Sequence, residues 1–189
     1  MKWLSFTSTI TAAWLCTLPF HGTAAHCDAK AWDQLVKIQQ KIDASYNQHA
    51  ERFNLLLQYH RQQPFLHQAF SSQELNTLWV TGTPSAKQKF ELQMESSRHL
   101  IQSISEESQL ISRLQQNVKE TRTQWRELSA HCHDARYATN SFISDNYVKS
   151  NDALLASLSE LLSKLATIQH RYRLELSTLM AVSNPPPDR

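Results

Sequence analysis

Glycine and proline, the residues that most often interrupt a helix, are nearly missing from long parts of this 189-residue chain. Glycine occurs only at positions 22 and 82, and proline only at positions 19, 64, 84 and 185–187. Residues 28–63 and 85–184 therefore contain neither of them. Uninterrupted stretches of this length are what long helices require.

Residues 28–63 carry a stripe whose members are separated by alternating steps of four and three. The stripe consists of Leu35, Gln39, Ile42, Tyr46, His49, Phe53, Leu56 and His60. This spacing is the heptad pattern of a helix that packs along another helix. Two histidines and a glutamine make it an imperfect seam.

A second helix is predicted to begin after Thr83, which can cap it while Pro84 occupies the first helical position. The same three-four spacing continues from Phe90 to Cys132. At about 1.5 Å per residue this helix would be roughly 70 Å long, a length typical of coiled coils. A third helix is predicted from a cap near Ser150 or Asn151 to about Val182, with leucine as its main seam residue.

Two connectors separate these expected helices. Residues 64–83 contain a capping box from Ser71 to Glu74, which predicts a short helix through Leu75, Leu78 and Trp79. Residues 134–149 have a mixed pattern and are expected to form the second connector, with side chains able to cover an end of the bundle: Tyr137, Phe142, Ile143 and Tyr147. The predicted fold is therefore all-α: an elongated antiparallel three-helix bundle or coiled coil, with a short extra helix in the first connector.

The first 25 residues have the layout of a secretory signal peptide. Lys2 precedes an apolar stretch that runs to Phe20, and small residues stand at Thr23 and Ala25. We expect cleavage after Ala25, with retention as an uncleaved anchor as the alternative. The mature chain would be periplasmic or secreted and would lack a transmembrane span. It would consist of a helical domain over residues 26–183 and a disordered, proline-rich tail over residues 184–189.

The charge balance and the lack of known catalytic motifs argue against several classes of function. Because the leader contains Lys2 and no acidic residue, its removal reduces the 19 basic side chains to 18 and leaves 17 acidic ones. This near-neutral balance, without basic runs, argues against a nucleic-acid partner. No G-x-S-x-G, P-loop, dinucleotide or H-E-x-x-H motif occurs. We therefore expect neither enzymatic activity nor a cofactor.

Two cysteines remain after the leader, Cys27 and Cys132. An up-down pair of helices returns the chain to the end where it began, so the two should lie close together. In an oxidising compartment this predicts a disulfide.

The alternative is a copper or zinc site built from His26, His131 and His133, which flank the two cysteines. Residues two apart on a helix do not face each other, so His131 and His133 could share a metal only beyond the end of the helix. The spacing also matches no zinc-finger or haem pattern.

The connector also holds the densest group of apolar side chains outside the expected seams. We predict a partner-binding surface formed by Phe65, Leu66, Phe70, Leu75, Leu78 and Trp79. The alternative is that these residues cover the end of the core and the part of the second helix that extends beyond the first. The expected function is a non-catalytic accessory protein, an adaptor or structural subunit that binds protein partners in the cell envelope. A metal-binding protein and a holdase chaperone are the alternatives, and a second copy completing the imperfect seams would make a homo-oligomer.

Overall fold

The structure, a computed structural model, describes residues 27–184, and these form an all-α fold. The helices are α1 (Ala29–Gln62), α2 (Leu66–Ala69), α3 (Ser72–Thr81), α4 (Pro84–Asp134) and α5 (Ala138–Ser183). The predicted leader, His26 and residues 185–189 of the predicted tail lie outside the described residues.

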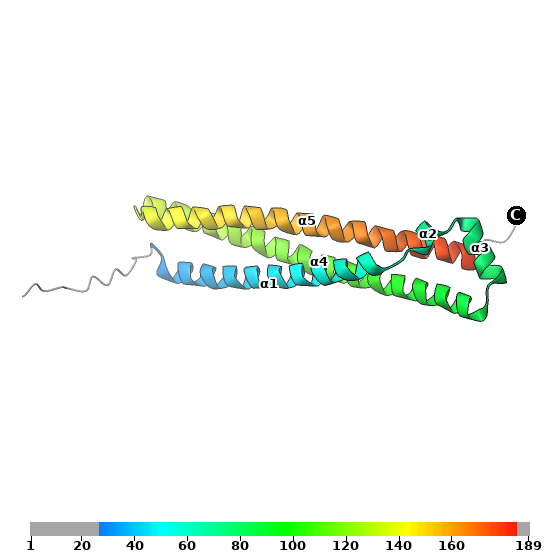
Figure 1. The fold of residues 1–189 in the computed structure, drawn as a ribbon. Coiled ribbons are helices and arrows are strands. Elements are labelled where there is room, and N and C mark those ends of the chain that lie inside the picture. The colour runs from blue at the N-terminus through cyan, green and yellow to red at the C-terminus, as the bar shows by residue number, and fades with distance from the viewer. Residues whose placement is uncertain (1–26, 185–189) are drawn as a thin grey trace, which may run out of the picture.

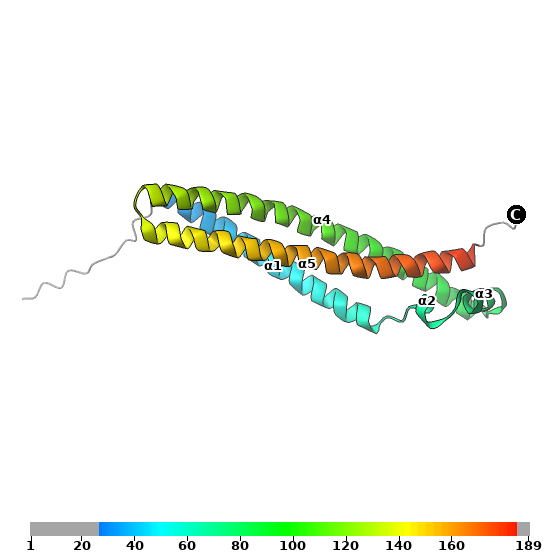
Figure 2. The same cartoon turned by 90° about the horizontal axis from the view of Figure 1, so that it is seen from above.

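The three long helices lie side by side, and α1 and α5 run in the direction opposite to α4 (Figure 1). Helix α5 contacts α4 most extensively, whereas α1 makes smaller interfaces with both. Viewed from above, α1 crosses the other two at an angle (Figure 2). The short helices α2 and α3 lie at the end where α4 begins and α5 ends (Figure 1).

The starts of three helices are capped by side chains, and the caps predicted at Ser71 and Thr83 are confirmed. Asp28 caps α1 by accepting a 2.9 Å hydrogen bond from the backbone N–H of Ala31. Ser71 and Glu74 form the expected capping box at α3. Thr83 caps α4, with Pro84 in its first turn. Each cap satisfies an N–H group that has no partner inside its helix.

Gly82 separates α3 from α4 at a point where the backbone approaches itself closely. Its φ of −68° is open to any residue. However, a Cβ atom at this position would collide with the backbone carbonyl oxygen of Leu78. The close approach, and not a left-handed conformation, therefore requires glycine here.

The expected connector over residues 134–149 and the predicted start of the third helix near Ser150 or Asn151 are wrong, because α5 already begins at Ala138. A tight turn joins α4 to α5, with Arg136 at φ 66° and the N–H of Tyr137 donating to the Cys132 carbonyl at 2.8 Å. In this stretch the buried positions of α5 are occupied by polar residues, Asn140 and Ser144. Their polarity concealed the helical period.

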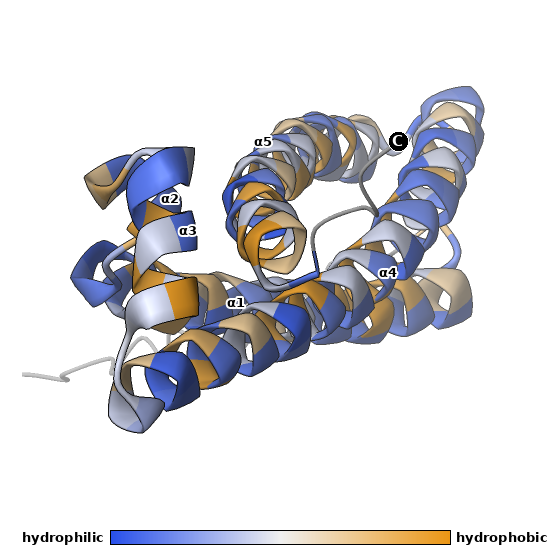
Figure 3. Ribbon diagram, turned by 90° about the vertical axis from the view of Figure 1, so that its right-hand side faces the viewer, coloured by the Kyte–Doolittle hydropathy of each residue, from blue (hydrophilic) through white to orange (hydrophobic). Residues whose placement is uncertain are grey.

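Each long helix carries both apolar and polar residues around its circumference (Figure 3), as an amphipathic helix does. The buried apolar residues form three clusters along the molecule. The central cluster joins all three long helices, and a second one surrounds Trp32 and Trp125 near Cys132. The third packs Leu75 of α3 against α4 and α5, in the region beyond the end of α1.

A buried polar layer links the three long helices between two of these clusters. The side-chain oxygen of Gln39 accepts hydrogen bonds from Asn151 Nδ2 at 2.8 Å and from Trp125 Nε1 at 3.3 Å. Trp125 also stacks on Tyr147, with ring centroids 4.1 Å apart. A polar contact between helices fixes their relative register, because sliding one helix would leave buried donors unsatisfied.

Candidate functional site at the connector end

The six residues predicted to bind a partner occupy different environments in the connector, residues 64–83. Phe65 and Leu75 are buried in the central and third clusters, and Leu66 and Trp79 pack partly buried against the third. Phe70 and Leu78 are 39% and 37% exposed. The sequence thus located an apolar segment correctly, but the fold uses four of its six side chains for its own packing.

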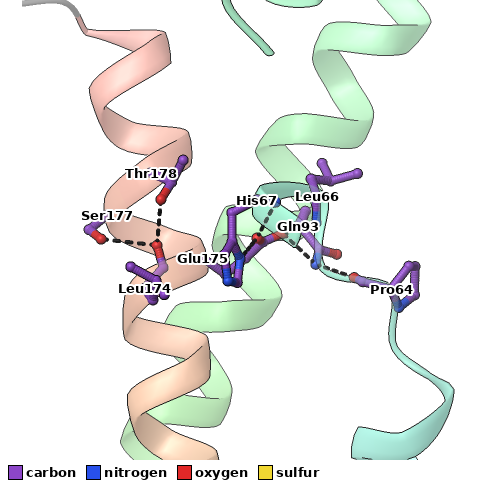
Figure 4. Close-up of polar contacts among 8 residues, drawn as sticks. All are labelled: Pro64, Leu66, His67, Gln93, Leu174, Glu175, Ser177 and Thr178. Atoms are coloured by element: carbon purple, nitrogen blue, oxygen red, sulfur yellow. Dashed lines mark hydrogen bonds and ion pairs between the residues drawn. The ribbon is translucent and has the colours of Figure 1, made fainter. Parts of the chain in front are cut away.

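Glu175 of α5 fastens the connector to the long helices (Figure 4). Its side chain is fully buried. Its Oε1 accepts hydrogen bonds from the Leu66 N–H at 2.9 Å and from Gln93 Nε2 at 3.1 Å. Its Oε2 accepts from the His67 N–H at 3.0 Å and lies 2.5 Å from His67 Nδ1. Gln93 of α4 also donates to the Pro64 carbonyl at 3.1 Å. Both oxygens are therefore used, and α2, α4 and α5 meet at one carboxyl group.

The Glu175 carboxyl group supplies hydrogen-bond acceptors at the N-terminus of the very short helix α2. Leu66 and His67 open α2, and their N–H groups have no partners within the helix. Phe65, the N-cap of α2, supplies no side-chain acceptor, so Glu175 takes that role from another helix. A buried carboxyl group is costly unless it is well hydrogen-bonded, which the four contacts provide.

Sequence reasoning did not identify Glu175 as a functional residue. A usable signal was present, because Leu161, Ile168 and Val182 are buried at seven-residue steps on the same face of α5. Glu175 occupies the remaining position of this row and is its only residue that is not apolar. An acidic residue within an apolar heptad row indicates a buried polar contact, but the sequence does not reveal its partners.

Helix α3 is anchored by packing as well as by its capping box. Leu75 is fully buried, and the Trp79 ring lies 5.9 Å from that of Phe90 in α4. Lys87 Nζ lies 5.8 Å from the centre of the Trp79 ring, within the range of a cation–π contact. The predicted cover of the longer second helix by the connector is thus present.

A cluster of aromatic rings lies beside the Glu175 contacts, where α1 ends. His60 contacts Phe65 and Tyr172, each with ring centroids 5.6 Å apart. Burial raises the pKa of Tyr172 to about 12, helped by the nearby Tyr59. Burial, together with the Arg171 guanidinium, lowers the pKa of His60 below its ordinary value of 6.5. Both pKa shifts favour the uncharged form of the side chain, for Tyr172 as for His60.

At the opposite end of the molecule, Cys27 and Cys132 form the predicted disulfide, with Cα atoms 5.2 Å apart. His131 and His133 lie in the last turn of α4 and are exposed. His133 Nδ1 is 3.4 Å from Asp134 Oδ1, and both side chains are more than four-fifths exposed. Over residues 27–184, no three histidine, cysteine or acidic side chains gather in a way that could hold a metal ion.

No helix in the described part of the chain is both long enough and apolar enough to cross a membrane. Comparisons of the chain with protein families, with curated proteins and with solved structures found no match.

Proposed function

We propose that this protein is an exported, non-catalytic accessory protein, an adaptor or structural subunit of a cell-envelope complex that acts through protein–protein contacts. Its body is an elongated antiparallel three-helix bundle released by removal of residues 1–25. The observation that carries the proposal is the exposure of Phe70 and Leu78 on a connector that is held in place from α5.

Anchoring of the connector supports a binding role. Glu175 fixes the start of α2, and Leu75 fixes α3, so Phe70 and Leu78 project from backbone that is already ordered. Val80 of α3 adds a third exposed apolar side chain. Binding through preorganised side chains avoids much of the entropy cost of ordering a loop, and aromatic residues are frequent anchors of protein interfaces.

Export is supported by the disulfide between Cys27 and Cys132, because such bonds persist mainly in oxidising compartments. The leader-like composition of residues 1–25 also supports export. Together they favour the periplasm or the medium as the place where a partner is met.

The test is site-specific crosslinking in the native cell envelope. A photoreactive amino acid replaces Phe70 or Leu78 in the full chain, and the crosslinked partner is identified by mass spectrometry. In a second step, Phe70→Ser and Leu78→Ser are combined in a chain that carries the photoreactive residue at Val80. We expect the combined substitutions to remove the adduct while circular dichroism and the melting temperature stay close to those of the unsubstituted chain.

The matched control is Leu110→Ser, which removes a leucine of similar exposure, 41%, from the middle of α4. This variant should keep the adduct. The proposal is wrong if no protein adduct forms at either position, or if Leu110→Ser and the connector variants reduce it equally.

A further inference from the structure

A groove of about 640 Å³ lies between the last turns of α1, the start of the connector and the middle of α5. Its volume is within the range of sites that hold small molecules, roughly 300–1,000 Å³. Apolar side chains from all three elements contribute to its lining: Phe53, Leu57, Phe65 and Ile168. The groove therefore offers an apolar surface next to the Glu175 contacts but not formed by them.

The charged side chains that line this groove are all basic. They are Arg61 of α1 together with Lys164 and Arg171 of α5, and neither aspartate nor glutamate is among the lining residues. Lys164 is paired with Glu160 outside the groove, at 2.7 Å. Neither arginine has a carboxylate partner within the part of the chain that the structure describes. The groove thus presents two guanidinium groups that form no ion pair with any described residue.

His60, which also lines the groove, adds a buried hydrogen-bond donor. Its Nε2 lies 3.3 Å from Arg171 Nη1, and an arginine can only donate, so Nε2 accepts and the ring proton resides on Nδ1. This Nδ1–H has no acceptor among the described protein groups, although the residue is only 8% exposed. The hydroxyl of Tyr172, on the neighbouring ring, also has no partner among them. Buried donors of this kind normally have an acceptor.

We propose that this groove is a binding site for a small amphipathic carboxylate, that is, a carboxylate attached to one alkyl chain or apolar side chain. Arg61 and Arg171 hold the carboxylate, because a guanidinium group can donate two parallel hydrogen bonds to it. The apolar part lies on Phe53, Leu57 and Ile168. A free fatty acid and the C-terminus of a peptide that ends in an apolar residue share this chemistry. The inference does not depend on the proposed partner site at Phe70 and Leu78.

The experiment is a titration of the isotope-labelled full mature chain, followed by two-dimensional NMR. The probes are decanoate below its micelle concentration, decyltrimethylammonium with the opposite charge, and acetate without the chain. We expect saturable shifts of the Leu57, Gln68 and Ile168 amides with decanoate, and affinity lower by about tenfold or more for the other two probes. A tripeptide ending in leucine, compared with its C-terminal amide, distinguishes the peptide source from the fatty-acid source.

Charge-reversal variants test the role of the two arginines, with a control arginine outside the groove. Arg61→Glu should weaken decanoate binding by about tenfold or more, whereas Arg173→Glu, on exposed α5 surface outside the groove lining, should leave it unchanged. Arg171→Glu is the second test, read only if circular dichroism matches the unsubstituted chain, because Arg171 also contacts His60. Equal binding of decanoate and decyltrimethylammonium, equal losses in Arg61→Glu and Arg173→Glu, or no saturable binding of either decanoate or the tripeptide would overturn the proposal.

Discussion

The carboxyl group of Glu175 holds His67 at two points, the backbone N–H at 3.0 Å and the ring Nδ1 at 2.5 Å, although 108 positions separate the two residues. Together with the Leu66 N–H, these contacts attach the connector to the end of α5. Helix α2 is therefore ordered by a tertiary contact and not by its own helix propensity, since it has only four residues.

Replacing Glu175 by alanine should destabilise the protein by about 1–3 kcal/mol, because several buried donors lose their only described acceptor. Hydrogen exchange should quicken most at the Leu66 and His67 amides, while the middle of α4 stays protected. Urea unfolding and exchange mass spectrometry measure the two effects. Glu160→Ala is the control, since its contact with Lys164 is exposed and such pairs contribute about 0–1 kcal/mol. Equal losses in the two variants would contradict this role of Glu175.

Reducing the Cys27–Cys132 disulfide should lower the free energy of unfolding. In the chain-entropy model, closing a loop of about 100 residues contributes roughly 4.7 kcal/mol, an upper value because residual structure in the unfolded chain reduces it. We expect faster exchange in the first turns of α1, which the bond ties to α4. Denaturation with and without reductant measures the loss, and Cys27→Ala, which should be insensitive to reductant, is the control. Intact mass after alkylation that reveals two free thiols without reduction would refute the bond.

Replacing Gln39 by leucine should destabilise the protein by about 1–3 kcal/mol, since Trp125 Nε1 then loses its acceptor in a buried layer. Asn151 retains one contact, to the Tyr147 carbonyl at 2.8 Å. Combining Gln39→Leu with Asn151→Leu should cost less than the sum of the two single changes, because both remove members of one network. A double-mutant cycle by urea unfolding measures this coupling. Strict additivity would show that the polar layer does not act as a unit.

Stability should fall as the pH drops below about 6.5, in a way that depends on His60. The pKa of this residue is lowered in the folded state, so the unfolded chain binds the proton more readily. Its stabilising effect is fully present above pH 6.5 and is lost as the pH falls from there toward the folded pKa. His60→Gln should show a smaller pH-dependent loss in urea unfolding, whatever its stability at high pH. Parallel curves for the two proteins would exclude this contribution.

The sequence predicted much of the helical framework because helix period and capping are local properties. The breaker-free stretches, the Thr83–Pro84 start of α4 and the Ser71–Glu74 box were all legible without a structure. The start of α5 was not, because its first seam positions are Asn140 and Ser144. A polar side chain can be buried between helices when it is small or when its polar atoms form hydrogen bonds. The hydropathy of the sequence alone does not reveal such positions.

What the sequence determined by itself was the class of fold, the capped starts of α3 and α4 and, through the up-down return of the chain, the pairing of Cys27 with Cys132. These follow from spacings that are read along one helix or between neighbouring helices. The tertiary structure alone decided which connector residues are buried, that Glu175 receives the start of α2, and that Arg61 and Arg171 line one groove. Those relationships join residues about a hundred positions apart, and their partners are set by how the helices cross and not by any local pattern.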